Sequence, residues 1–389
     1  MKAEVKCQVC GQTNWCNLPM AQEEKSVTTS GIIVDQPLGK TQCLNCGLVQ
    51  RTHESFMGLS NFYEQDYKNY FDRPGAASYD LPRYRAMANW IYEVVKSFNP
   101  KNILDVGCGR GWTITELKKL FPNSQFTGVE PSIHNADKAS ESGLKVHNGF
   151  VSTLKDKLEK YNLIYSTNVL QHVTNIENFI SDLLEHLTDD GIILITCPNS
   201  TMPSSEMMFC DQNFSFAPIH LFKIAEKLNL NIVNWKEAPS DILSLSEKQL
   251  IVLSKNKNNL NLFTGKIEDF DVKKNIVERE HYLNSWKTLD TIINDRLADS
   301  GSIYNFGSSM WSYLLRAYCP KYWDRVLNCT IENVTGTFAD KKVIPINEIK
   351  FKQNDTLVLG VNPTYQIMLK EKLKIYCKNI VTWHDIINK

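Results

Sequence analysis

Strand-like and helix-like hydrophobic patterns alternate along the middle of the chain. Between the strand patterns, residues 113–120 have the spacing of a helix. The run from Gly191 to Pro198 is continuously apolar, as expected of a parallel strand that is covered on both faces. The alternation predicts an α/β fold around a parallel sheet. The predicted strands begin at Ile103, Gln125, Tyr161 and Gly191.

The two ends of the chain continue in other patterns. A helix is predicted over residues 79–98, ahead of the first strand of the sheet. The polar stretch 255–261 interrupts the periodicity, and apolar positions on one face then predict a long helix over 272–300. A strand, glycine turn and helix follow from Gly301, and a later strand ends at Asn362. We expect three domains, over residues 1–70, 71–255 and 256–389. The turn-rich stretch 71–78, at the start of the second domain, is expected to be a hinge or lid.

Three alternating glycines follow the first predicted strand, at Gly107, Gly109 and Gly111. They let the chain turn sharply and let a ligand lie against bare backbone, while the next helix presents its N-terminal N–H groups. The second strand ends at Glu130, 19 residues after Gly111, where a carboxylate can accept ribose hydroxyls. Dinucleotide folds usually carry G-x-G-x-x-G, whereas here the third glycine comes one residue early and Trp112 takes its place. The spacing favours S-adenosylmethionine (SAM) over NAD.

The segment from Asp105 to Gly111 resembles motif I of the Rossmann-like (class I) SAM-dependent methyltransferases. The resemblance implies that Asp105 helps to hold the methionine end of SAM and that Glu130 binds the ribose hydroxyls. The glycines between them would lie against the cofactor. A glycine-rich turn without a ligand is the alternative interpretation of this segment.

A later segment, residues 161–173, resembles the fourth-strand motif of the same family. The resemblance implies that Asn168 borders the sulfonium. His172 is either a base or a packing and hydrogen-bonding residue. Many relatives place an acidic residue near the adenine, and here Phe150 is expected to pack against the adenine instead.

Four cysteines near the N-terminus form two C-x2-C pairs separated by 32 residues. They are Cys7, Cys10, Cys43 and Cys46. Four thiolates at this spacing can surround a tetrahedral Zn²⁺, and a glycine after each pair suits the turn of a zinc knuckle. The sequence therefore predicts a structural Zn²⁺ site. Four free thiols, or a disulfide pair, are the alternatives.

The order of zinc knuckles, SAM motif and a further domain resembles the deoxysugar C-methyltransferases of the tylosin and tetronitrose type. Residues 43–50 are close to the second knuckle of those enzymes, and Tyr63 and Tyr67 match the tyrosines after it. The resemblance implies a zinc-binding module, a Rossmann-like SAM domain and a C-terminal α/β domain that helps to hold a nucleotide-linked sugar. In that domain the turn 306–309 is either an anion site at a helix N-terminus or a bare turn.

The chain departs from those enzymes after the fifth strand. They carry a Tyr-x-Glu-His-like cluster that deprotonates carbon beside a ketone, whereas this chain has Phe209, Asp211 and Gln212 there. An amide does not titrate near neutral pH, so Gln212 cannot be a general base. We expect another titrating residue to take the proton. His220 is the favoured catalytic residue, ahead of Asp211 and His172.

The balanced charge of the chain argues against a nucleic-acid partner. The chain of 389 residues has 43 Lys and Arg against 43 Asp and Glu, which gives no basic field for a nucleic acid. There is no run of 18 apolar residues and no signal-peptide pattern, so we expect a cytoplasmic protein without a membrane partner. The oligomeric state is left open.

Three functions fit these observations. The preferred one is a SAM-dependent methyltransferase that acts on a nucleotide-linked sugar, at carbon or oxygen. The second is an O- or N-methyltransferase for another small molecule on the same scaffold. The third is a non-catalytic protein that binds zinc and SAM, and the intact Asp105, glycines and Glu130 argue against it.

Overall fold

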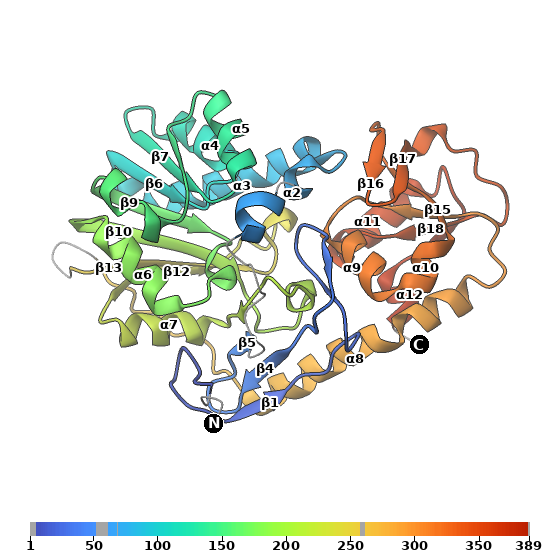
Figure 1. Ribbon diagram of the computed structural model, residues 1–389, viewed down its shortest axis with the longest axis horizontal. Coiled ribbons are helices and arrows are strands. Elements are labelled where there is room, and N and C mark those ends of the chain that lie inside the picture. The colour runs from blue at the N-terminus through green and yellow to red at the C-terminus, as the bar shows by residue number, and fades with distance from the viewer. Residues whose placement is uncertain (1–4, 52–60, 68, 257–260, 388–389) are drawn as a thin grey trace.

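The structure is a computed structural model that describes residues 5–51, 61–67, 69–256 and 261–387. The chain forms a larger lobe from its middle part and a smaller lobe from its C-terminal third, and one long helix runs along both (Figure 1). The N-terminal strands lie beside that helix, below the larger lobe in this view. None of the helices that the structure describes is long and apolar enough to cross a membrane.

The larger lobe contains a seven-stranded sheet of order β12-β13-β10-β9-β6-β7-β8. Five neighbouring strands, from β10 to β8, are parallel, and β13 is antiparallel to both of its neighbours, β10 and the edge strand β12. The carboxyl ends of the parallel strands therefore meet at one edge of the sheet, which is where ligands bind in such folds. The strands are β6 (Asn102–Val106), β7 (Gln125–Glu130), β8 (Val146–Asn148), β9 (Tyr161–Thr167), β10 (Leu187–Pro198), β12 (Asn231–Glu237) and β13 (Lys248–Ser254).

Helices flank this sheet, and local signals begin several of them. Ser132 and Asn175 cap their helices by accepting a hydrogen bond from a backbone N–H three residues on. Pro218 opens another helix, at a position where a missing N–H costs nothing. The helices are α2 (Asn69–Asp72), α3 (Ala76–Val95), α4 (Trp112–Leu120), α5 (Ile133–Glu141), α6 (Ile176–Glu185) and α7 (Pro218–Lys227).

The N-terminal part forms a small antiparallel sheet that the larger lobe completes. Its order is β1-β4-β5-β11, and β11 belongs to the loop that follows β10. A separate two-stranded ladder joins β2 to β3. The strands are β1 (Trp15–Asn17), β2 (Ser26–Val27), β3 (Ile33–Val34), β4 (Lys40–Cys43), β5 (Val49–Arg51) and β11 (Phe214–Ser215).

The long helix α8 leads to the smaller lobe, whose six-stranded sheet has the order β16-β17-β15-β14-β18-β19. All of its pairings are parallel except that between β16 and β17. The elements are α8 (Val272–Arg296), β14 (Ile303–Phe306), α9 (Met310–Tyr318), α10 (Pro320–Arg325), β15 (Val326–Ile331), β16 (Gly336–Phe338), β17 (Lys341–Pro345), β18 (Thr356–Leu359), α11 (Pro363–Leu373), β19 (Asn379–Val381) and α12 (Trp383–Ile387).

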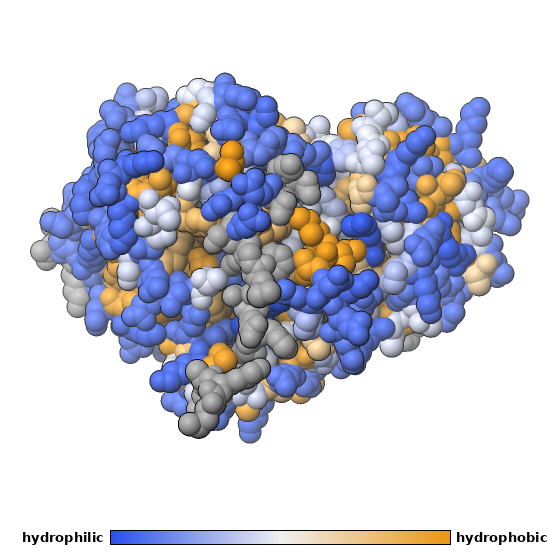
Figure 2. Space-filling view, in the orientation of Figure 1, coloured by the Kyte–Doolittle hydropathy of each residue, from blue (hydrophilic) through white to orange (hydrophobic). Residues whose placement is uncertain are grey.

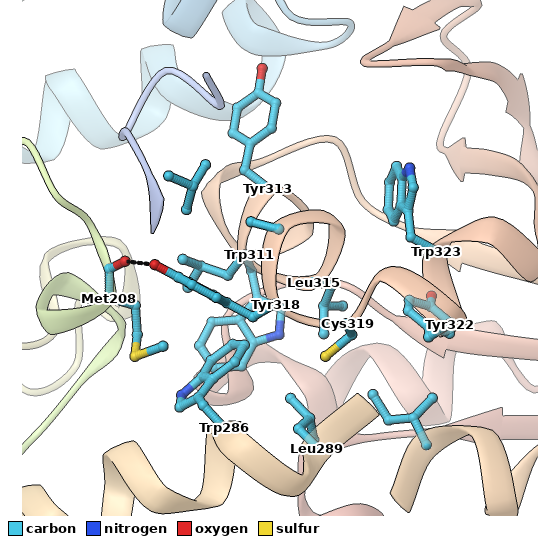
Figure 3. Close-up of a cluster of buried hydrophobic side chains, with 14 of the residues drawn as sticks. Met208, Trp286, Leu289, Trp311, Tyr313, Leu315, Tyr318, Cys319, Tyr322 and Trp323 are labelled. Carbon is cyan, nitrogen blue, oxygen red and sulfur yellow. Dashed lines mark hydrogen bonds between the residues drawn. The ribbon is translucent and has the colours of Figure 1, made fainter. Parts of the chain in front are cut away.

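An aromatic cluster fastens α8 to the smaller lobe. Trp286 of α8 is fully buried, and its ring lies 5.3 Å from that of Trp311 and 5.1 Å from that of Trp383. Tyr318 joins the same cluster and donates a 2.7 Å hydrogen bond to the carbonyl of Met208 in the larger lobe (Figure 3). The cluster therefore connects both lobes through one hydrophobic core.

The structure confirms the α/β pattern and shifts several boundaries. The helix predicted over 79–98 begins at Ala76, because the left-handed Gly75 (φ 79°) already ends the preceding turn. The turn-rich hinge predicted over 71–78 is therefore shorter. Residues 257–260 of the predicted connection lie outside the described residues. The boundaries after residues 70 and 255 stay predictions, and β11 shows that the first module shares its sheet with the second.

Replacing Trp286 by Ala should destabilise the protein by about 3–5 kcal/mol, because it removes a fully buried ring and leaves a cavity. Ile292, on the exposed side of the same helix, is the control. Its replacement by Ala should change the free energy of unfolding by no more than about 0.5 kcal/mol. Urea denaturation of both variants measures the difference, and equal midpoints would contradict the assignment.

Candidate functional site

A cavity of about 1120 Å³ lies where the two lobes and the N-terminal part meet. The surface is indented between the lobes, and hydrophobic side chains show beside the indentation (Figure 2). All three parts of the chain contribute to the wall of the cavity. Examples are Tyr63 and Phe71 from the segment before α3, Gly107 and Glu130 from the larger lobe, and Gly307 and Tyr365 from the smaller lobe.

The glycine loop after β6 forms part of this wall. Gly107 and Gly109 both have positive φ angles, 78° and 55°. A Cβ atom on Gly107 would collide with the side chain of Val169, in the loop after β9. A Cβ atom on Gly109 would lie 2.8 Å from Cζ of Phe71. Only glycine fits these two positions, so the loop brings bare backbone to the cavity.

Glu130 lies at the end of β7 and lines the same cavity. Its Oε2 accepts a 2.8 Å hydrogen bond from the backbone N–H of Gly109, and its Oε1 accepts one of 2.9 Å from that of Ser132. Burial raises the pKa of this carboxyl to about 7. When ionised, each oxygen keeps a second lone pair for a ligand hydroxyl.

Two of the predicted cofactor residues do not line the cavity. Asp105 lies within β6 and is 1% exposed, and burial raises the pKa of its carboxyl to about 8. Gly111 caps α4, and a Cβ atom there would collide with the side chain of Leu144. Asp105 and Gly111 are therefore not part of the cavity wall, and their roles toward the cofactor, which for Asp105 can be direct or through water, stay predictions. Phe150 and Asn168 do line the cavity, beside Gly107, Gly109 and Glu130.

Asn168 has a left-handed backbone (φ 55°) directly after β9. Its side-chain Oδ1 accepts a 2.8 Å hydrogen bond from Nζ of Lys248. Lys248 also lines the cavity, and the sequence analysis did not identify it. In the sequence, its only signal is a charged residue two positions before the apolar run of β13.

Among the three predicted bases, His172 lines the cavity. Its Nδ1 lies 2.8 Å from the backbone carbonyl of Asp211 and 2.8 Å from the hydroxyl of Tyr63. A carbonyl only accepts, so Nδ1 carries the proton and Nε2 keeps its lone pair. Burial lowers the pKa of His172, so the ring is neutral at physiological pH.

His220, the favoured base, does not line the cavity. It is fully buried, Nδ1 accepts a 2.8 Å hydrogen bond from the N–H of Ala217, and Nε2 donates one of 2.7 Å to the carbonyl of Cys46. Burial lowers the pKa of His220 to about 3. Both ring nitrogens are occupied, so this geometry does not support a catalytic role. His220 instead ties α7 to the second cysteine pair.

Asp211 is also fully buried and does not line the cavity. Its carboxylate accepts hydrogen bonds from the backbone N–H of Thr29, at 2.8 Å, and from the hydroxyl of Thr29, at 2.5 Å. The side chain therefore holds the N-terminal segment, and the structure does not support the prediction that it faces the pocket. Its backbone carbonyl accepts a hydrogen bond from Nδ1 of His172, and its Oδ2 lies 3.7 Å from the same nitrogen.

Two of the residues that stand in place of the Tyr-x-Glu-His-like cluster reach the cavity. Phe209 and Gln212 both line it. Gln212 is 6% exposed, and its Oε1 has no hydrogen-bond partner among the residues that the structure describes. This amide oxygen is therefore available to a donor group on a ligand.

The four predicted metal ligands come together. The Sγ atoms of Cys7, Cys10, Cys43 and Cys46 all lie within 4.8 Å of one another. The closest pairs are Cys7–Cys46 at 3.6 Å and Cys10–Cys43 at 3.5 Å. Zn–S bonds of about 2.3 Å in a tetrahedron place the sulfurs about 3.8 Å apart, so the donor set fits zinc.

The smaller lobe presents its glycine turn to the cavity. Gly307 has φ 130°, Ser309 precedes the first turn of α9, and both line the wall. Ser308 donates a 2.8 Å hydrogen bond to the carbonyl of Pro74, next to the start of α3. The turn that the sequence offers as an anion site or a bare turn thus lines the same cavity as the glycine loop of the larger lobe.

Residues 79–232 match a protein family described as a methyltransferase domain. The ubiquinone biosynthesis O-methyltransferase of Pelagibacter ubique is 29% identical over 205 residues, which are 50% of this chain and 73% of the relative. The malonyl-[acyl-carrier protein] O-methyltransferase of Bacillus cereus is 31% identical over 133 residues, 31% of this chain and 48% of the relative. Beyond the first relative, the chain thus spans about half the length of the curated relatives, or less.

Among solved structures, the plantazolicin methyltransferase BpumL in complex with SAH is 17% identical with a TM-score of 0.38, and the likeness covers 51% of this chain and 95% of that one. Residues 79–232, which match the methyltransferase domain family, contain the five parallel strands from β6 to β10, the glycine loop and Glu130. The chain therefore contains a class I SAM-dependent methyltransferase domain.

Proposed function

We propose that this protein transfers a methyl group from SAM to a hydroxyl oxygen of a small molecule, and that a nucleotide-linked sugar is the preferred acceptor. The observation that carries the proposal is the shared cavity. The SAM loop with Gly107 and Glu130 forms one part of its wall, and the smaller lobe with Gly307 and Tyr365 forms another. A volume of about 1120 Å³ holds a cofactor together with an acceptor.

The choice of oxygen rests on the residues that line the wall. Removal of a proton from carbon needs a strong base beside the acceptor. Phe209 and Gln212 line the cavity where related enzymes have such a base, and neither side chain can act as one. A hydroxyl nucleophile needs alignment with the sulfonium carbon and one proton acceptor. His172 has a free lone pair on Nε2 and lines the cavity. We assign it as the base.

The acceptor class has a second candidate. The first curated relatives are named as O-methyltransferases of ubiquinone biosynthesis and of malonyl-[acyl-carrier protein], which are not sugar enzymes. These names favour an acceptor other than a sugar, which offers a hydroxyl or carboxylate oxygen to the same scaffold. A screen of nucleotide sugars against phenolic and carboxylic acceptors, with SAM that carries a labelled methyl group, separates the two. Transfer of label to none of them would contradict the proposal.

We also propose that the four N-terminal cysteines hold Zn²⁺ as a structural ion. Backbone carbonyls of the second cysteine pair accept hydrogen bonds from the larger lobe and from α8. His220 donates to the carbonyl of Cys46, and Arg279 donates to that of Gly47 at 2.7 Å. The metal would thereby support the wall of the cavity, at a distance from the reaction.

The affinity for S-adenosylhomocysteine (SAH), the demethylated product, should fall as the pH decreases from 8 to 6. The carboxylate of Glu130 accepts ribose hydroxyls only when ionised, and its pKa is about 7. Below that pKa the affinity should drop by up to about tenfold for each pH unit. Calorimetry at several pH values measures it. Glu130→Gln should bind SAH weakly without this pH step, and an unchanged step would contradict the assignment.

His172→Ala should lower kcat by roughly 10²–10⁴-fold with an acceptor from the screen, because the hydroxyl then loses its proton acceptor. SAH binding should stay intact, since the ring lies at the acceptor. His281→Ala, at an exposed position of α8, is the control and should leave kcat unchanged. A near-neutral effect of His172→Ala would mean that positioning alone suffices.

Elemental analysis should find about one Zn²⁺ per chain. Cys43→Ser should lose the metal and loosen the N-terminal sheet, because three thiolates hold zinc less tightly than four. Cys16 lies outside the group of four, so Cys16→Ser should retain the metal. A metal-free, active protein in which all four thiols react with an alkylating reagent would refute the zinc site.

A further inference from the structure

Lys248, the first residue of β13, lines the cavity. Methyl transfer itself does not require a cation at this place. Lys248 pairs with Pro198, the last residue of β10, at the edge where the parallel strands end. Its Nζ donates one hydrogen bond, to Oδ1 of Asn168 at 2.8 Å, and it forms no ion pair with the carboxylates that the structure describes. An ammonium group has three donors, so two remain for a ligand.

The contact with Asn168 places this ammonium close to the donor-binding loop. Asn168 follows β9, which neighbours β6 in the sheet. The next residue, Val169, touches Gly107 closely enough to exclude any side chain there. Lys248 is therefore near the place where the methyl group leaves the donor, and not at the far end of the cavity by the turn of Gly307.

Arg83 of α3 is a second cation in the same wall, and its Nη2 lies 3.7 Å from Oδ1 of Asp80. After burial, its charge has the largest effect on Lys248, and together they lower the pKa of that lysine to about 8. Glu247 and Glu206 act in the opposite direction, but with smaller effects. Burial and the nearby Arg83 thus both disfavour an unpaired charge on Lys248, and a bound anion would relieve this cost.

We propose that Lys248 and Arg83 bind an anionic group, a carboxylate or a phosphate, which the acceptor carries close to the oxygen that is methylated. Guanidinium and ammonium groups are the side chains that bind both anions by charge-assisted hydrogen bonds. The inference rests on the proposed function and narrows its acceptor. The acceptor is then a hydroxy acid or a phosphorylated hydroxyl compound. Among nucleotide-linked sugars this means a sugar acid or a sugar phosphate, because the diphosphate of a neutral sugar is remote from the reacting oxygen.

Titration of the SAH-loaded protein with inorganic phosphate and with malonate tests the subsite. At least one of the two should bind, and the tighter one indicates whether the acceptor group is a phosphate or a carboxylate. Lys248→Gln and Arg83→Gln should each weaken that binding by about tenfold or more, because each removes a charged hydrogen-bond partner. Lys248→Arg should retain most of it.

Lys372 supplies the matched control. It also lines the cavity but already pairs with Glu332 at 2.6 Å, so Lys372→Gln should leave anion binding unchanged. SAH affinity, measured for every variant, shows that the fold and the donor site are intact. If neither anion binds the wild type, or if Lys248→Gln binds as well as the wild type, the subsite is refuted.

Failure of the wild type to bind SAH would refute the proposed function instead. The anion titration of the unloaded protein would then still decide the subsite, through the same comparison of Lys248→Gln with Lys372→Gln.

Discussion

The three parts that surround the cavity depend on one buried cation, Arg279 of α8. Its Nη1 donates to Oε1 of Gln42 and to the carbonyl of Gly47, both at 2.7 Å, and its Nη2 donates to the carbonyl of Ser200 at 2.8 Å. Burial lowers the pKa of this guanidinium to about 10, so it stays charged at neutral pH. Three carbonyl oxygens replace much of the hydration that the guanidinium loses on burial, and without these hydrogen bonds the buried charge would be costly. The N-terminal sheet, the loop after β10 and α8 are therefore fixed to one another at a single point.

The features that the sequence predicted well are those that short segments determine. The glycine loop needs left-handed backbone within a few residues, and the carboxylate at the end of β7 follows from the strand pattern. The two cysteine pairs are also local, and each pair of thiols needs only its own turn. Gly107 and Glu130 therefore line one cavity, and the four cysteines form one cluster elsewhere, as their spacing indicates.

The catalytic residues were predicted less well, because contacts between distant segments decide their roles. His220 is bonded to Cys46, 174 residues away, and Asp211 to Thr29, 182 residues away. Nothing around His220 or Asp211 in the sequence reveals that these partners will occupy them. Lys248 was missed for the opposite reason: a lone lysine before an apolar strand is usually a solvated strand end, and only the fold places it in a cavity wall.

The shared sheet of the N-terminal part has a consequence for biosynthesis. Strand β5 pairs with β4 on one side, but its partner on the other side is β11, whose residues 214–215 follow more than a hundred residues later. At translation rates of about 5–20 residues per second, its edge stays open for on the order of ten seconds. An open edge of this kind attracts other chains. The N-terminal sheet is thus completed only after the five parallel strands of the larger lobe have been made.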